Sequence, residues 1–152
     1  MKKILPAFTC CFFVAMIACS TKDKPAPDPD PPALVGLKSI RLNGADMADR
    51  TYGTARKPVV EVQFTTAVLP ASVTGAVQLT GSGGQPVTVN TSLQAGDAAL
   101  LITPADDLMP LSSYKLVISN ALKSAAGGNF TGTVNKQFLT GIDSTDKFSL
   151  IS

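Results

Sequence analysis

Apolar and polar residues alternate along the middle of the chain in short runs. In Val59–Phe64, for example, every second side chain is apolar, and the intervening residues include Glu61 and Gln63. Successive side chains of a strand point to opposite faces, so such a run predicts a strand with one face in a core. The same reasoning predicts strands at Leu37–Leu42, Val59–Phe64, Ala76–Leu79, Val87–Asn90, Ala99–Thr103, Tyr114–Ile118 and Val134–Thr140.

The region between residues 34 and 141 shows no sustained helical periodicity and is rich in Thr, Val, Gly and Ser. About seven short strands separated by turn residues are typical of an all-β Greek-key sandwich. Asn43-Gly44 predicts a turn after the first strand, because both residues tolerate positive φ. The glycine-rich segment Gly81–Gly84 predicts the long tip of a hairpin between the third and fourth strands.

The N-terminus carries the features of an export signal. Lys2 and Lys3 precede a mostly apolar run over residues 4–18, and Cys19 follows it. The run is shorter than the roughly 20 apolar residues that span a bilayer, so we expect a signal peptide and not a membrane helix.

A proline-rich segment, Ser20–Pro32, follows Cys19 and contains five prolines and no aromatic residue. Such a composition predicts a disordered, extended tether. At about 3.1 Å per residue, it would hold a domain on the order of 40 Å from its anchor. We therefore divide the chain into a signal peptide (residues 1–18), a tether (19–33), one domain (34–141) and a tail (142–152).

The composition excludes most chemistry. The chain has 13 basic and 11 acidic residues, and loss of Lys2 and Lys3 with the signal balances them, so nucleic acid is not an expected partner. There is no His, and export removes Cys10 and Cys11. We predict no catalytic residue, no metal and no cofactor, and we assign the scattered Asp residues to turns and solvated positions.

The segment before the sixth predicted strand has a distinctive pattern. Leu108, Pro110, Ser112 and Tyr114 occupy alternate positions. The pattern resembles the tyrosine corner of immunoglobulin-like and fibronectin-like sandwiches, in which the Tyr hydroxyl bonds to the backbone at a corner between two strands. The alternative is that Tyr114 only packs in the core.

Further segments in the same order resemble the bacterial Ig-like modules of S-layer and other surface proteins. They are Val62–Val68, Ala71–Val73, Leu101–Pro104, Leu122–Asn129 and Phe138–Thr140. The likeness covers about residues 37 to 140 and implies an immunoglobulin-like Greek-key β-sandwich. Two turns depart from the pattern, because Ala67 replaces a common Pro and Ser124 a common Asp.

Met16-Ile17-Ala18-Cys19 resembles the lipobox of bacterial lipoproteins, with Met16 in place of the usual Leu. The resemblance implies cleavage between Ala18 and Cys19 and attachment of lipid, including palmitate, to the Cys19 sulfur. Ser20 implies sorting to the outer membrane of a Gram-negative cell. The alternative is an ordinary secretory peptide with a chance Cys.

The tail after the last strand, Gly141–Ser152, is polar and then apolar. It resembles the linker before the catalytic domain of secreted glucoamylase-like and β-glucan-cleaving lipoproteins. The resemblance implies that the chain is the accessory front of a carbohydrate-active enzyme. The alternative, a small stand-alone lipoprotein, stays open.

These observations predict a non-catalytic, monomeric spacer or docking module, held in the cell envelope by a membrane anchor at Cys19. The alternative is an adhesion module that binds a glycan or an envelope protein through loops at one end of the sandwich. The candidate residues for that alternative are Arg50 and Tyr52, in an exposed loop expected at residues 50–56, and Gly83 and Gly84, in the tip expected at residues 81–86.

Overall fold

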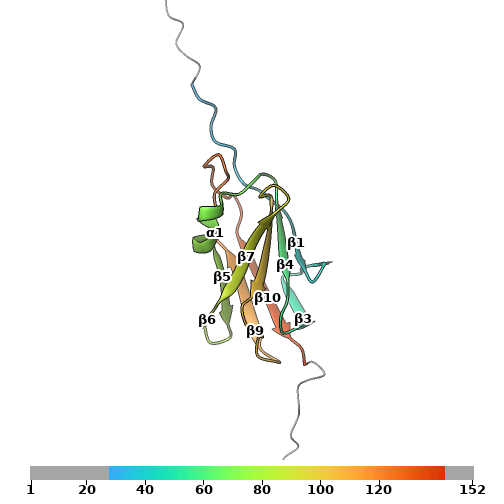
Figure 1. Cartoon of the computed structure of the whole chain (residues 1–152). Helices are drawn as coiled ribbons and strands as arrows, with labels where there is room; N and C mark the ends of the chain where they lie inside the picture. Colours follow the sequence, from blue (N-terminus) through green and yellow to red (C-terminus); the bar gives the residue numbers. More distant parts are fainter. Residues whose placement is uncertain (1–27, 143–152) are drawn as a thin grey trace, which may run out of the picture.

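A computed structural model describes residues 28–142, and two five-stranded sheets pack face to face in it (Figure 1). The first sheet has, in spatial order, β2 (Ala45–Asp46), β1 (Leu37–Leu42), β4 (Val60–Phe64), β8 (Ala99–Pro104) and β7 (Val89–Gln94). The second has β3 (Arg50–Thr54), β10 (Val134–Thr140), β9 (Ser113–Ile118), β5 (Val77–Gly81) and β6 (Pro86–Val87). The prediction of an all-β sandwich is confirmed.

The seven main strands follow the immunoglobulin order. If β1, β4, β5, β7, β8, β9 and β10 are lettered A to G, the first sheet contains A-B-E-D and the second contains G-F-C. Each of the seven predicted segments overlaps one of these strands, and the bounds of β1 and β10 agree with the prediction.

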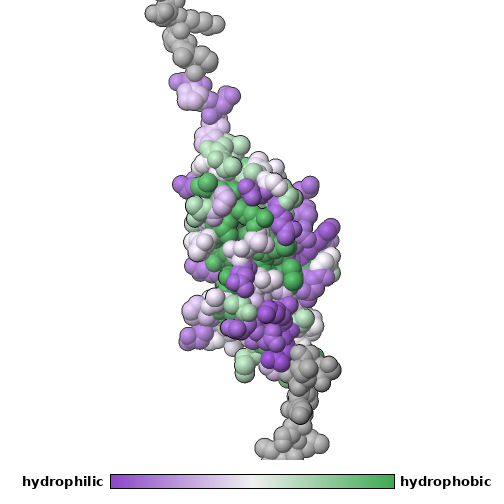
Figure 2. All heavy atoms as spheres, in the orientation of Figure 1, coloured by the Kyte–Doolittle hydropathy of each residue, from purple (hydrophilic) through white to green (hydrophobic). Residues whose placement is uncertain are grey.

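The core lies between the two sheets and comes from the alternating residues. Val60, Val62 and Phe64 of β4 are buried, and so are Leu116 and Ile118 of β9. These strands contribute every second side chain to the same interior, so the period-two pattern produces one continuous core. The apolar residues that reach the surface are green in Figure 2.

A short helix, α1 (Pro70–Ala76), connects β4 in one sheet to β5 in the other. It begins at Pro70, whose missing N–H is not needed in the first helical turn. Val73 and Ala76 face the core. The predicted strand at Ala76–Leu79 is therefore wrong at its first residue, because seven helical residues are too few to show a clear period.

The predicted hairpin after β5 is only partly correct. β6 pairs with β5 through Thr80–Pro86 and Leu79–Val87, as a hairpin requires. The chain then changes sheets at Thr88, and β7 pairs with β8. Pro86 has no N–H to donate, so the pairing with β5 cannot extend as a regular ladder.

The prediction of an exposed loop at residues 50–56 is wrong for its first five residues. They form β3, which pairs in parallel with β10 at the edge of the second sheet. The sequence of β3, Arg-Thr-Tyr-Gly-Thr, has no apolar alternation. Its position depends on long-range backbone bonds, from Gln137 N–H to the Asp49 carbonyl and from Gly141 N–H to the Thr54 carbonyl.

The β1–β2 turn has the predicted geometry, with φ of 51° at Asn43 and 83° at Gly44. Among residues 28–142, no helix is long and apolar enough to cross a membrane.

Candidate functional site

Within residues 28–142 the structure shows no cluster of side chains suited to hold a metal ion. No three acidic, His or Cys side chains in that range are grouped as metal ligands. Asp46 lies 3.5 Å from Arg41, and Asp49 contacts Lys136. Cys19, Ala18, the signal peptide and residues 143–152 lie outside the described residues.

Tyr114 lies at the start of β9, and its ring is buried. Its hydroxyl accepts a hydrogen bond of 2.9 Å from the backbone N–H of Met109, and its ring stacks on Phe138 at 5.6 Å. Leu108 is buried, and the Ser112 hydroxyl donates to the Pro110 carbonyl at 2.9 Å. Tyr114 thus fixes the loop between β8 and β9 to the end of the second sheet.

Thr140, which the sequence analysis did not single out as a functional residue, lies at the centre of the same corner. It is fully buried; its hydroxyl donates to the Met109 carbonyl at 2.6 Å and accepts from the Ser112 N–H at 2.9 Å. Tyr114 and Thr140 therefore bind the N–H and the C=O of the same residue. The sequence signal for Thr140 was the segment Phe138–Thr140, one of those that resemble the bacterial Ig-like modules, in which Thr140 had no assigned role.

One ion pair joins the start of β3 to β10. Lys136 Nζ lies 2.6 Å from the Asp49 carboxylate, and the Lys136 side chain is mostly buried. The hydrogen bond and the charge of Lys136 lower the pKa of Asp49 below its ordinary value of 3.8, since both favour the carboxylate.

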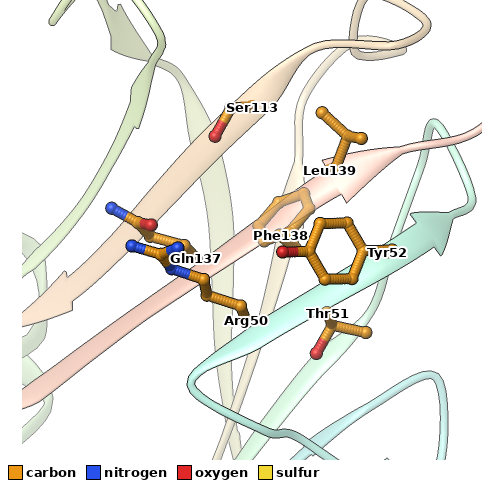
Figure 3. A pocket seen from close by; sticks show the side chains of 7 residues that line it. All are labelled: Arg50, Thr51, Tyr52, Ser113, Gln137, Phe138 and Leu139. Carbon is orange, nitrogen blue, oxygen red and sulfur yellow. The ribbon is translucent and has the colours of Figure 1, made fainter.

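The outward face of the second sheet contains a cavity of about 270 Å³. Figure 3 shows Arg50 and Gln137 side by side on the paired strands β3 and β10, with the Tyr52 hydroxyl directed toward the same space. Ser113 of β9 borders the cavity, and the Tyr52 ring is 70% exposed. Arg50 and Tyr52 therefore belong to a strand on a sheet face, and not to a loop as expected.

A second cavity of about 340 Å³ adjoins the first. Ser113 and Gln137 line both cavities, so together they form one groove across the sheet, which we call the sheet groove. The far part of the sheet groove is lined by Lys115 and by the β5–β6 turn, including Gly84. Gly83 lies in that turn but does not line the cavity.

The lining of the sheet groove contains two cations and no acidic side chain. Arg50 and Lys115 occupy the same cross-strand row, because each is paired in register with Gln137. No Asp or Glu lines either cavity, and neither cation has an ion pair within the described part of the chain. Two unpaired cations therefore flank a central amide.

Comparison with solved structures finds similar folds in several proteins. The surface-layer protein SbsC, domains 1–6, is 19% identical with a TM-score of 0.48 over 72% of this chain. The α2-macroglobulin fragment from Escherichia coli is 13% identical with a TM-score of 0.50 over 71% of the chain and 32% of the fragment. CopC from Methylosinus trichosporium OB3b is 18% identical with a TM-score of 0.49, over 70% of this chain and 93% of CopC.

The match to this chain spans only 14% of the surface-layer structure. At such identities the likeness concerns the fold alone. No curated protein matches the sequence. A family model described as a bacterial Ig-like domain matches residues 38–140, which include every main strand except the first residue of β1. The chain therefore belongs to the bacterial Ig-like domain family.

Proposed function

We propose that this protein is a non-catalytic spacer and docking module of the cell envelope, anchored by a lipid on Cys19. The observation that carries the proposal is the position of the two ends of the described chain. The N-terminal segment enters the sandwich at one end of its long axis, and the C-terminal segment leaves it at the other end (Figure 1). A module inserted in this way separates the segment before it from the segment after it by its full length.

The N-terminal segment, where the chain enters the domain, is firmly attached to the sandwich at Val35. Val35 is fully buried and forms a parallel bridge with Phe130. Its N–H donates to the Asn129 carbonyl at 3.1 Å, and its carbonyl accepts from the Thr131 N–H at 2.9 Å. A tether attached through these bonds would hold the domain in a fixed direction at the point where the chain enters it.

The absence of a side chain at Gly128 makes this attachment possible. A Cβ at Gly128 would collide with the carbonyl oxygen of Ala33 and lie 2.7 Å from its carbonyl carbon. The loop that contains Gly128 is thus shaped around the incoming backbone, which supports a role in which the direction of the tether matters.

The opposite end of the domain, where the chain leaves it after Thr140, presents apolar side chains to solvent. Met109 is 67% exposed, Leu111 is 63% exposed and Ile142 is 54% exposed. Met109 belongs to the loop that Thr140 binds, and Ile142 comes two residues after Thr140. Exposed apolar groups near the point where the chain leaves the domain are suited to pack against a further domain, for example the catalytic domain of a carbohydrate-active enzyme.

The lipid anchor rests on the sequence of residues 16–19, and the outer membrane is the proposed location. Membership of the bacterial Ig-like family fits a cell-envelope protein. The proline-rich tether would place the domain on the order of 40 Å from the membrane surface.

Metabolic labelling with a clickable palmitate analogue tests the anchor. We expect the wild-type protein to be labelled and to partition with membranes, and Cys19→Ala to lose both properties. Cys11→Ala is the matched control, because it removes a thiol from the signal peptide and should leave the labelling unchanged. Labelling or membrane partition of Cys19→Ala would overturn the proposal of a lipid anchor.

The coding sequence after Ser152 tests the docking role. An open frame that continues into a second domain supports a front module. A stop codon directly after Ser152 would remove the connection to a hydrolase.

A further inference from the structure

The sheet groove is not used by the proposed spacer function. It crosses the face of the second sheet from β3, past β10 and β9, to β5 and its turn. Three strand spacings correspond to about 14 Å. A ligand that fills the groove is therefore longer than one sugar unit or one amino acid.

The charge of the groove selects an anionic ligand. Arg50 and Lys115 are its cations, and Gln137 lies between them in the same row. Side-chain nitrogens are the partners of carboxylate or sulfate oxygens, and a guanidinium group can bind a carboxylate through two hydrogen bonds. A polymer with an acidic group on each unit could engage both ends of the row at once.

The remaining lining favours a saccharide over a peptide. Besides the Tyr52 ring, Leu139 and the buried rings of Phe138 and Tyr114, the groove offers hydroxyl and amide groups from Ser113, Gln137, Thr80 and Ser82. Peptides are commonly held by several apolar side chains in pockets, and of the residues that line this groove only Tyr52 presents a large, exposed apolar side chain. Sugar hydroxyls match the polar lining, and the apolar face of a sugar ring can stack on the exposed ring of Tyr52.

We propose that the sheet groove binds an acidic polysaccharide, with Arg50 and Lys115 pairing with its carboxylates and Tyr52 stacking on a sugar ring. The site lies on the side of the domain, so a polymer could bind there while both ends of the module stay engaged (Figure 1). Binding of this kind would attach the module laterally to an anionic polymer of the envelope or its surroundings.

The test measures binding of the full chain, purified in detergent, to polygalacturonate at low ionic strength by isothermal titration calorimetry. Fully methyl-esterified polygalacturonate is the matched neutral polymer, and poly-L-glutamate is the acidic peptide. We expect binding of polygalacturonate only, and we expect it to weaken as salt is added.

Variants of the groove locate the site. We expect Arg50→Gln with Lys115→Gln to weaken binding about tenfold, and Tyr52→Ala to weaken it about fivefold. The matched control is Lys38→Gln with Lys123→Gln, which removes the same charge from two exposed lysines outside both cavities. The control should bind within about twofold of wild type, since screened distant charges contribute little.

Three results would overturn the proposal. They are no binding of polygalacturonate by the wild-type protein, equal binding of poly-L-glutamate, and an equal loss of affinity in the two double variants. A circular dichroism spectrum shared with wild type shows that each variant is folded, so that loss of binding is assigned to the groove.

Discussion

The corner formed by Tyr114 and Thr140 provides the sharpest test of the energetics of this domain. Both hydroxyls bind Met109, one at its N–H at 2.9 Å and the other at its C=O at 2.6 Å. The first perturbation, Tyr114→Phe, removes one oxygen and keeps the ring stacked on Phe138. The second, Thr140→Val, keeps the shape of a fully buried side chain and removes its hydroxyl.

Each variant leaves backbone groups without a partner in a buried or half-buried place. Tyr114→Phe leaves the Met109 N–H without its hydrogen-bond acceptor. Thr140→Val removes the hydroxyl that binds the Met109 C=O and the Ser112 N–H. An unsatisfied group of this kind costs about 1–3 kcal/mol. We expect losses of about 1.5 kcal/mol for Tyr114→Phe and about 2 kcal/mol for Thr140→Val. The first corresponds to a fall in Tm of about 6 °C for a domain of this size.

The two losses should not add. Once one hydroxyl is gone, the loop around Met109 is held less firmly, and the second hydrogen bond contributes less. We therefore expect the double variant to lose about 0.5–1 kcal/mol less than the sum of the single losses, as residues of one network do.

Urea unfolding monitored by circular dichroism measures all three variants. Tyr52→Phe is the matched control, because it removes the same atom from a Tyr that is 70% exposed, and its midpoint should not change. An unchanged midpoint for Tyr114→Phe, or losses that add within about 0.3 kcal/mol, would refute the idea of one coupled corner.

Three further predictions concern the loop around Gly128, the ion pair of Asp49 with Lys136, and the core at Leu116. Gly128→Ala should displace Ala33, lower the free energy of unfolding by about 1–3 kcal/mol and speed proteolysis near residue 33. Gly75→Ala is the control, because a Cβ at this position in α1 meets nothing within 4 Å and should not destabilise the domain. Equal urea midpoints for the two variants would contradict this prediction. The pKa of Asp49 is lowered by folding, so its contribution exists above the unfolded value of 3.8 and disappears as the pH falls through the folded pKa. The urea midpoints of wild type and Asp49→Asn should therefore differ at neutral pH and converge in acid, and a difference that persists in acid would count against the pair. Leu116→Ala should cost about 3 kcal/mol by leaving a core cavity, and a loss below about 1 kcal/mol would mean that the sheets close over the gap.

The sequence determined most of the sandwich, because the main strands other than β7 carry a pattern of their own. In β4 and β9, alternation is visible within five or six residues, and burial follows it residue by residue. The turn at Asn43-Gly44 is equally local, since those residues adopt positive φ with little strain. The candidate corner could also be located, because its four residues lie within seven positions that lead into β9.

Only the tertiary structure decided the features that depend on partners distant in the chain. β3 has no apolar pattern and exists as a strand because β10, which lies far along the chain, pairs with it. The change of sheet between β6 and β7 and the role of Thr140 are likewise set by neighbours from other segments. The sheet groove joins Arg50, Gln137 and Lys115 across three strands. A one-dimensional pattern encodes which face of a strand is buried, but strand order and register decide which side chains meet on the exposed face, and these are fixed only when the whole sheet forms.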